Sequence, residues 1–289
     1  MKAGAITSSR VRSWLPRRPL DSHKGLNGHV LIVAGSRGMS GAAILTALGA
    51  LQTGAGLVTV ATIPSERPTV AARVPEALTL ALPETRAGCI GPGAYPVLRR
   101  YWQGRRINVI AAGPGLSVHP SVRNLILALL EKWTGSLVLD ADGLNNIKPI
   151  DIRRRQGLVL TPHVGELARL SRVNPSVVRR EGLGLAEALA KRLSCTCVLK
   201  GHRTLVTDGT RTYCNTTGNP AMATGGMGDV LTGIVASFLG QGLSALQAAA
   251  AGVYLHGLAG DLARESDRGL LATHLARVLP LALKKIGVK

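Results

Sequence analysis

The chain has 289 residues, 46% of them hydrophobic and 3% aromatic, and its 35 lysines and arginines against 16 acidic residues give a formal net charge of +19. This length fits one large α/β domain, so we expect a single domain over residues 1–289, with a flexible basic lead-in at residues 1–20. A membrane protein is not expected, because no apolar stretch is long enough to span a bilayer. A secreted protein held by disulfides is not expected either, because the N-terminus lacks the apolar segment of a signal peptide and the four cysteines are scattered. We therefore expect a cytoplasmic location.

Taken in chain order, short β-branched apolar runs alternate with segments whose apolar residues recur at helical spacing. Two helices also carry start signals, a proline at position 120 and the Ser244 and Gln247 of a capping box. The expected elements are a strand at 29–34, a helix whose apolar face runs from Ile44 to Ala55, strands at 57–62 and 107–112, a helix at 120–133, strands at 137–141 and 158–160, a helix from Asn174 to about Leu193, a strand at 196–200, a hairpin at 204–215, and last two long helices at 229–239 and 244–264.

These strands are rich in Val, Ile and Leu on both faces, which predicts a largely parallel sheet covered by helices on both sides, a three-layer α/β/α fold. In such sheets ligands bind beyond the carboxyl ends of the strands. Five strand exits deliver glycines or polar clusters to that edge, so we expect the functional groups to gather there. Among these exits are the segments that begin at Gly35, Gly113, Asp140 and Thr161.

The most informative segment is residues 218–229, which read Gly-Asn-Pro-Ala-Met-Ala-Thr-Gly-Gly-Met-Gly-Asp and lead into an apolar helix. Its glycines allow successive N–H groups to converge on one anion at a helix N-terminus. Asp229 would repel a phosphate there unless it takes a proton from the hydroxyl that attacks the phosphorus. On this segment alone, an ordinary turn followed by an aspartate that complements the helix dipole is an equally good interpretation.

Three other kinds of site are disfavoured. The glycine turn at 35–41 lacks the acidic residue that a dinucleotide-binding fold places at the end of its second strand, since no carboxylate precedes Glu66 there. No Walker-type phosphate loop occurs. A zinc site is not expected, because His163, Cys195 and Cys197 do not have the spacing of a ligand set.

The net charge of +19 invites a nucleic-acid-binding interpretation. The basic residues are dispersed along the sequence rather than gathered in one stripe, and with 3% aromatics there is little to stack on bases. The charge is better suited to attracting small anionic substrates. A basic nucleic-acid-binding protein stays open as an alternative, and its signature would be salt-sensitive binding to generic DNA or RNA without nucleotide turnover.

With these segments in place, the chain resembles the ATP/ADP-dependent NAD(P)H-hydrate dehydratases, a branch of the ribokinase-like superfamily. Seven segments match in the family's order between about residue 20 and residue 262, which makes the match specific although each segment alone would be weak. The matching segments are residues 23–25, Gly35 with 41–43, 113–116, 140–145, 160–166, 199–204 and 218–229.

The resemblance implies a carbon–oxygen lyase that repairs nicotinamide cofactors. The terminal phosphoryl group of ADP or ATP passes to the hydroxyl of (S)-NADHX or NADPHX, and elimination of phosphate regenerates NADH or NADPH with AMP or ADP as the other product. The cofactors are Mg²⁺ and the nucleotide co-substrate. The residues that the resemblance implies are Asp229 as catalytic base; Gly225, Gly226, Met227 and Gly228 as anion hole; Ala42, Gly115, His163 and Asp229 for the hydrated cofactor; Lys200, Gly201, His202, Arg203, Thr204 and Gly228 for the nucleotide; and Glu166 for Mg²⁺ through water.

The chain departs from the family in three respects. Met227 stands where the family has threonine, which removes any phosphate contact from that hydroxyl, and His202-Arg203 is bulkier and more basic than the family's usual residues. Many members carry an N-terminal epimerase domain, for which this chain has no room, and stand-alone members tend to use ADP and to form tetramers. We therefore expect a homotetramer. A ribokinase-like kinase of the hydroxymethylpyrimidine or thiazole type is the nearest alternative, since it would use the same aspartate and anion hole.

Overall fold

The structure is a computed structural model and describes residues 3–152 and 155–288. Every strand expected from the sequence is present, with ends that shift by no more than a residue or two. Two strands, β1 and β4, were not expected. The strands are β1 (Gly4–Ala5), β2 (His29–Val33), β3 (Leu57–Thr62), β4 (Leu78–Ala81), β5 (Val109–Ala112), β6 (Ser136–Leu139), β7 (Leu158–Leu160), β8 (Thr196–Leu199), β9 (Leu205–Thr207) and β10 (Thr212–Cys214).

Within the described residues these strands form one sheet in the order β1-β10-β9-β8-β7-β6-β5-β2-β3-β4. Neighbours pair in parallel throughout, except that β9 runs antiparallel to both β8 and β10. The prediction of a mostly parallel sheet is thus confirmed. The chain leaves β2 toward β3 on one side and later returns to β5 on the other, which places a topological switch point between β2 and β5.

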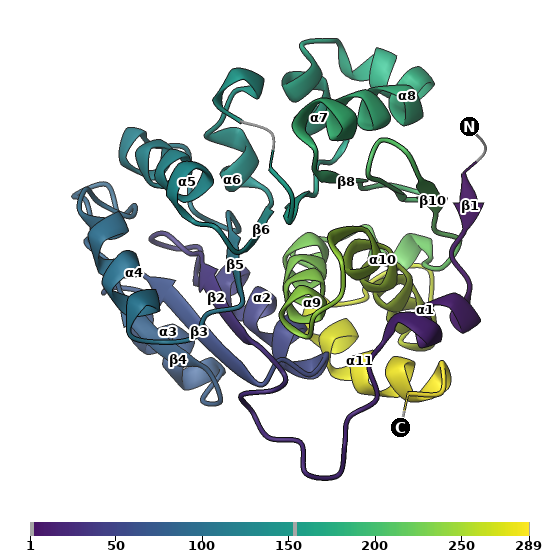
Figure 1. Ribbon diagram of the computed structural model, residues 1–289, viewed down its shortest axis with the longest axis horizontal. Coiled ribbons are helices and arrows are strands. Elements are labelled where there is room, and N and C mark those ends of the chain that lie inside the picture. The colour runs from purple at the N-terminus through teal and green to yellow at the C-terminus, as the bar shows by residue number, and fades with distance from the viewer. Residues whose placement is uncertain (1–2, 153–154, 289) are drawn as a thin grey trace.

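Helices cover both faces of the sheet, as the strand composition predicts. Figure 1 shows α9, α10, α11 and α1 together on one side and α4 to α8 on the other. Within the described residues, no helix combines the length and the apolarity that crossing a membrane requires. The helices are α1 (Ser8–Trp14), α2 (Ser40–Gln52), α3 (Arg67–Arg73), α4 (Ala94–Gln103), α5 (Pro120–Lys132), α6 (Asp142–Asn145), α7 (Val164–Ser171), α8 (Pro175–Leu193), α9 (Met227–Gly240), α10 (Ala245–Leu262) and α11 (Ala272–Lys285), with 3₁₀ turns at Pro149–Asp151 and Pro220–Met222.

Alternate residues of each strand enter two separate cores, which is the physical basis of the three layers. In β2, Val30 and Ile32 join the cluster formed with α1, α2, α3, α9, α10 and α11. Leu31 and Val33 join the opposite cluster, formed with α4 to α8. All four side chains are fully buried. A central parallel strand therefore has no polar face, as its near-continuous apolar sequence predicts.

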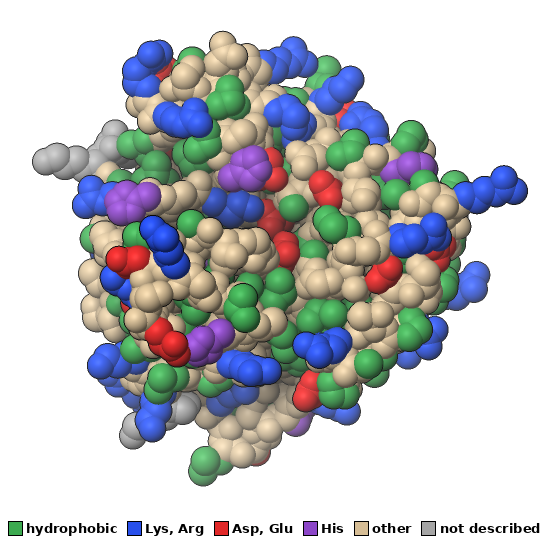
Figure 2. Space-filling model, turned by 180° about the vertical axis from the view of Figure 1, so that it is seen from behind, with side chains coloured by type: hydrophobic (Ala, Val, Ile, Leu, Met, Phe, Trp, Pro, Cys, Tyr) green, Lys and Arg blue, Asp and Glu red, His purple; other side chains and the backbone are tan. Residues whose placement is uncertain are grey.

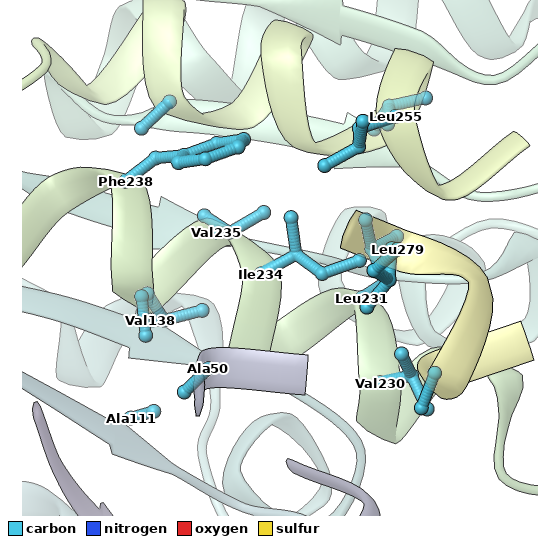
Figure 3. Packing of buried hydrophobic residues seen from close by; sticks show 14 of the residues in the cluster. Ala50, Ala111, Val138, Val230, Leu231, Ile234, Val235, Phe238, Leu255 and Leu279 are labelled. Atoms are coloured by element: carbon cyan, nitrogen blue, oxygen red, sulfur yellow. The ribbon is translucent and has the colours of Figure 1, made fainter. Parts of the chain in front are cut away.

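Helix α9 lies at the centre of the first of these cores. Figure 3 shows Ile234 and Phe238 directed from α9 toward residues of α10 and α11, with Val138 of β6 on the opposite side. The side chains of Ile234 and Phe238 are each at most 1% exposed. A helix that is apolar on all sides is stable only when it is enclosed in this way. The enclosure fixes the position of the N-terminus of α9, where residues 225–229 lie.

The expectation that residues 1–20 form a flexible lead-in is wrong for residues 4–14, which contain β1 and α1. Gly4–Ala5 pairs in parallel with β10, and Val11 of α1 is fully buried. Trp14 of α1 packs edge-on against Tyr213, with ring centroids 5.7 Å apart. These contacts bury apolar surface against a distant part of the chain, which local composition cannot reveal.

Helix α11 was also not expected, because the last helix predicted from the sequence ends at about residue 264. Pro280 lies inside α11 and interrupts the pattern that marks a helix. The buried residues Leu275 and Leu279 nevertheless anchor α11 on the core around α9. The capping box predicted at Ser244 and Gln247 is confirmed at the start of α10.

Close packing of α2 against α9 yields a stability prediction. A Cβ added at Gly233 would lie 2.0 Å from the carbonyl oxygen of Thr46, so Gly233→Ala must push the helices apart. We expect a loss of about 1–3 kcal/mol or more in the free energy of unfolding, measured with urea. The matched control is Gly184→Ala on α8, where an added Cβ meets nothing within 4 Å and a helical alanine should stabilise by about 0.5–1 kcal/mol. Equal effects of the two changes would contradict the packing.

Candidate active site

The switch point between β2 and β5 brings two predicted substrate residues together. Ala42 lies in the first turn of α2, and Gly115 lies in the turn that follows β5. A Cβ added at Gly115 would be 3.0 Å from the side chains of both Ala42 and Met39, and the residue has a φ of +62°. Glycine is therefore required at this position for the two segments to meet. The site begins where these two segments meet at the carboxyl edge of the sheet.

The segment after β6 contributes a strained turn to the same edge. Ala141 has φ 46° and ψ −119°, a backbone conformation that non-glycine residues rarely adopt. The turn directs the carboxylates of Asp140 and Asp142 to different partners. Asp142 accepts a hydrogen bond of 2.8 Å from the Ser117 N–H and thereby holds the loop after β5, whereas Asp140 turns toward the interior.

A buried ion pair between Asp140 and Lys200 is the core of the site. Asp140 is 1% exposed, and its Oδ1 accepts hydrogen bonds from Lys200 Nζ and, at 2.7 Å, from Thr161 Oγ1. Its Oδ2 accepts one of 2.7 Å from Thr232 Oγ1 of α9. Burial by itself would lower the pKa of Lys200, but the negative charges of Asp140 and Glu166 outweigh it and raise the pKa above its usual value. Lys200 therefore carries a positive charge.

Asp229 lies in the first turn of α9, beside this pair. Burial, together with the neighbouring charge of Asp140, raises the pKa of Asp229 to about 7, although Lys200 acts in the opposite direction. Gly228 lies at the same point: a Cβ added there would be 3.5 Å from Lys200 Nζ and 3.8 Å from Asp140 Oδ2. The carboxyl group of Asp229 is thus poised between its protonated and ionised forms near neutral pH, as general acid–base chemistry requires.

Residues 225–228, predicted as an anion hole, form the N-terminus of α9. Gly226 is the N-cap with a φ of +87°, and in the first backbone hydrogen bond of the helix the Val230 N–H donates to the Gly226 carbonyl oxygen. The N–H groups before Val230 lie at the end where a helix has no acceptors of its own, which is the property that binds anions. Figure 2 shows acidic, basic and histidine side chains meeting near the centre of one face of the molecule.

Met227, which departs from the family's threonine, has a structural explanation. Its side chain is 6% exposed and belongs to the core around α9. The Met227 side chain therefore packs into the core and holds the first turn of α9 in place, so that it does not cover the exposed N–H groups of that turn. The sequence alone could not show this, because the residues that surround Met227 are distant in the chain.

Glu166 and His163 form a capping box at the start of α7. His163 Nδ1 accepts hydrogen bonds from the Gly165 and Glu166 N–H groups, and Glu166 Oε2 accepts one of 2.8 Å from the His163 N–H. Burial raises the pKa of Glu166 to about 7 against the effect of Lys200. A parallel β-bridge between the backbones of His163 and Lys200 also places His163 beside the ion pair. Its imidazole is neutral at pH 7, because burial and Lys200 lower its pKa.

The donor set fits a magnesium ion that is held through water. Among the described residues, no group of three or more His, Cys, Asp or Glu side chains is arranged to hold a metal ion directly. Both oxygens of Asp140 are already occupied, whereas Oε1 of Glu166 has only His163 Nε2 at 3.5 Å. Mg²⁺ characteristically keeps several waters and is held by one or two carboxylates together with substrate phosphates. Glu166 is suited to accept hydrogen bonds from such waters.

The predicted nucleotide segment forms a tight turn after β8. Thr204 Oγ1 donates a 2.9 Å hydrogen bond to the Gly201 carbonyl, and Arg203 has a φ of +57°. Lys200 reaches the ion pair, while His202 and Arg203 are exposed at the tip of the turn. The structure therefore brings Lys200, Gly228, Asp229 and Glu166 into one electrostatic centre but leaves His202 and Arg203 at its margin.

Three residues of this centre were not among the predicted site residues: Asp140, Thr161 and Thr232. The signal for Asp140 was available, since a carboxylate directly after a buried strand of a parallel sheet reaches the ligand-binding edge. Thr232 lies within an apolar helix and could not be assigned from sequence, because its hydrogen bond to Asp140 spans 92 residues.

The fold and this centre define a mostly parallel α/β protein with an open helix N-terminus, a buried ion pair and a titratable carboxylate at the carboxyl edge of its sheet. A family model described as NAD(P)H-hydrate dehydratase matches residues 30–281. The chain belongs to the NAD(P)H-hydrate dehydratase family.

Individual relatives agree with this. The chain is 43% identical over 290 residues to a bifunctional NAD(P)H-hydrate repair enzyme of Moorella thermoacetica, covering 97% of this chain and 54% of the relative. It thus spans about half the length of the first curated relatives it matches. Two solved structures are also similar. One is an ADP/ATP-dependent NAD(P)H-hydrate dehydratase of Bacillus subtilis co-crystallised with ATP and Mg²⁺ (TM-score 0.84, 31% identity, 99% of both chains). The other is a ribokinase-like superfamily protein of Enterococcus faecalis (TM-score 0.84, 28% identity, 99% and 97% of the chains), which confirms the expected fold class.

The raised pKa of Asp229 predicts a pH-dependent loss of stability. Because its folded pKa of about 7 lies above the usual value near 4, the folded state binds more protons in this window, and stability falls as pH rises from about 4 to 7. Asp229→Asn should therefore unfold at a higher temperature than the wild type at pH 8, and the difference should shrink at pH 5.

Thermal unfolding at the two pH values, without nucleotide or Mg²⁺, measures this. Asp267→Asn serves as the control, since that side chain is 65% exposed and should show no such difference. An Asp229→Asn variant that is no more stable than the wild type at pH 8 would contradict the buried, charge-crowded position of Asp229.

Proposed function

We propose that the protein is a nucleotide-dependent dehydratase that restores NADH or NADPH from its hydrated form, (S)-NADHX or NADPHX. The observation that carries the proposal is the meeting of the open N-terminus of α9, a charged Lys200 and an Asp229 carboxyl with a pKa of about 7. Anion-binding groups and a base at one point are what phosphoryl transfer to a hydroxyl needs. The names of the Moorella and Bacillus relatives supply the substrate.

The chemistry follows from these groups. Asp229 accepts the proton of the substrate hydroxyl as the hydroxyl oxygen forms a bond to the terminal phosphorus of the nucleotide, and the bond from that phosphorus to the bridging oxygen breaks, so that AMP or ADP departs with its electrons. The N–H groups of Gly225 to Gly228 and the charge of Lys200 stabilise the negative charge on the transferring group. The phosphate then leaves with the electrons of the carbon–oxygen bond, and loss of a proton from the adjacent ring carbon restores the double bond of the dihydronicotinamide.

The remaining assignments are part of the proposal. Ala42, Gly115 and His163 would contact the hydrated cofactor at the carboxyl edge of the sheet, and residues 200–204 would bind the nucleotide. Glu166 would hold Mg²⁺ through water, and the ion would supply positive charge to the phosphates. A homotetramer, a cytoplasmic location and a single domain over residues 1–289 stay predictions, as does the choice between ADP and ATP.

The proposal is tested by incubating the protein with Mg²⁺ and chemically hydrated NADH, with ADP or ATP in separate reactions. We expect the near-ultraviolet absorbance of reduced nicotinamide to return, with one phosphate released for each cofactor restored. Absence of recovery with both nucleotides would contradict the proposal. A stable phosphorylated product without released phosphate would favour a kinase, and salt-sensitive binding of nucleic acid without turnover would favour the nucleic-acid-binding alternative.

Replacement of the base gives a second prediction for this site. Asp229→Asn should lower kcat by ~10²- to 10⁴-fold and leave nucleotide binding nearly unchanged, because the amide cannot accept the proton but has almost the same shape. In the wild type kcat should rise with pH through about 7 as Asp229 ionises. Stopped assays over pH 5.5 to 8.5 and calorimetric nucleotide binding measure the two effects. If the variant kept most of its rate, another group would be the base.

A further inference from the structure

A large cavity that the proposed reaction does not use lies at the end of the sheet opposite the candidate active site. Its volume is ≈ 1040 Å³, and it is bordered by α1, by the segment that follows α1 and by the C-terminal ends of α2, α9 and α11. Helices α2 and α9 both begin at the candidate active site. Because α9 has 14 residues, its far end lies about 20 Å from Asp229. A ligand in this cavity would therefore be separate from the reacting groups.

The lining of the cavity combines apolar side chains with positive charge. Phe238 is 1% exposed, and Leu51 and Leu283 are half-buried. No aspartate or glutamate is found among the described residues that line the cavity. The cationic side chains of the lining are all exposed and are those of Arg12, Arg17, Arg18 and Lys284. The cavity thus offers apolar surface and positive charge without any opposing carboxylate.

One of these cations has a structural role that requires no ligand. Cations at helix C-termini complement the helix dipole, and Arg18 donates a hydrogen bond to the Gly54 carbonyl just after α2. The ends of α2 and α9 also share another donor, since Gln241 Nε2 donates to the carbonyl oxygens of Thr53 at 3.0 Å and Ser237 at 3.2 Å. These two helix ends therefore do not depend on the other three cations.

The other three cations have no partner in residues 3–152 and 155–288. There the side chains of Arg12, Arg17 and Lys284 form neither a hydrogen bond nor an ion pair. Lys284 lies in the last turn of α11 and complements the dipole of its own helix. Arg12 comes from α1, and a Cβ added at Gly287 would be 3.1 Å from its Nη1 atom, so its guanidinium group lies beside the end of α11.

The charge and the polar groups of the cavity favour a phosphate over a carboxylate. Neighbouring positive charges repel one another, and an anion between them would remove that repulsion. A phosphate group with close to two negative charges balances several cations better than a single carboxylate does. Guanidinium groups bind phosphate oxygens in a bidentate geometry. Ser9 and Ser13 lie with Arg12 on the face of α1 that lines the cavity, and they add hydroxyl donors.

We propose that this cavity is a binding site for a phosphorylated small molecule that also has an apolar part. The phosphate is held by Arg12, Arg17 and Lys284, and the apolar part packs against Phe238 and its neighbours. The volume is that of a large ligand cavity, so the ligand is bigger than a phosphate ion alone. The proposal goes beyond the proposed function and does not rest on it, because none of the lining residues takes part in that reaction.

The sequence offers a natural reporter for the test. Phe238 is the one phenylalanine of the chain, so labelling with ¹⁵N-phenylalanine gives a single amide signal from a residue that lines the cavity. This signal is followed by NMR while the full-length protein is titrated with 2-naphthyl phosphate, hexyl phosphate, 2-naphthol or inorganic phosphate. Calorimetry on the same samples gives the Kd of each probe.

We expect at least one of the two phosphate esters to shift the Phe238 signal and to bind about 10-fold more tightly than 2-naphthol or inorganic phosphate, since each of these makes only part of the contacts. The ratio of the two ester affinities shows whether the site prefers a flat ring or an aliphatic chain. Arg12→Gln and Arg17→Gln should each weaken the binding of that ester by about 10-fold, because each removes a hydrogen bond to a charged group.

The matched control is Arg179→Gln on α8, which removes the same charge at an exposed position outside the cavity and should bind the ester as the wild type does. A Phe238 signal that neither ester shifts would overturn the proposal, and a cavity closed by a second copy of the chain would give this result. Equal weakening in Arg12→Gln and Arg179→Gln would also overturn it, because net charge alone would then explain the binding. Failure to restore NADH would count against the proposed function alone.

Discussion

The buried ion pair of Asp140 and Lys200 is the interaction on which the site depends. Taking two charges out of water costs several kcal/mol per ion, which only good geometry and further hydrogen bonds repay. Here Thr161 and Thr232 supply those bonds. The pair therefore ties β6, β7, β8 and α9 to one point, and it fixes the distance of the α9 N-terminus from the edge of the sheet.

The same pair sets the electrostatics of the site. Lys200 is the positive charge that faces Asp140, Asp229 and Glu166, and its pKa is raised by all three carboxylates. Burial raises the pKa of the two carboxyl groups beside the pair, the negative charge of Asp140 adds to the effect and the single cation Lys200 does not cancel it, so both groups hold protons up to a pH of about 7. A proton-accepting group with that pKa is useful to an enzyme near neutral pH. The crowding also explains why additional positive charge is expected to accompany the phosphates of a nucleotide.

The parts of the fold that follow from local pattern were predictable from sequence. The strands at 57–62 and 158–160 agree with β3 and β7 to the residue, and the capping box of α10 is present as expected. The edge of the sheet that carries the site was predictable from the glycine and polar motifs at strand exits, which parallel topology brings together. The individual site residues were implied by the family resemblance. The roles that those residues have in catalysis are matters for experiment.

The features that sequence could not predict all depend on contacts between distant segments. Residues 3–14 look like a basic lead-in, but Val11 and Trp14 have partners about 200 residues away in the chain. Met227 looks like a loss of function in a phosphate loop until its burial is known. Thr232 looks like an ordinary residue of an apolar helix, because the group that it serves, Asp140, lies on another element.

The central claim is that the hydroxyl oxygen of the substrate is phosphorylated before it leaves. The most direct test uses cofactor that has been hydrated in ¹⁸O-labelled water, so that this oxygen carries the label. If phosphorylation precedes elimination, every labelled oxygen leaves bonded to phosphorus, and the ³¹P NMR signal of the released phosphate shows the isotope shift of one ¹⁸O. Label found in water, with unlabelled phosphate, would show that the carbon–oxygen bond breaks without phosphoryl transfer and would contradict the account.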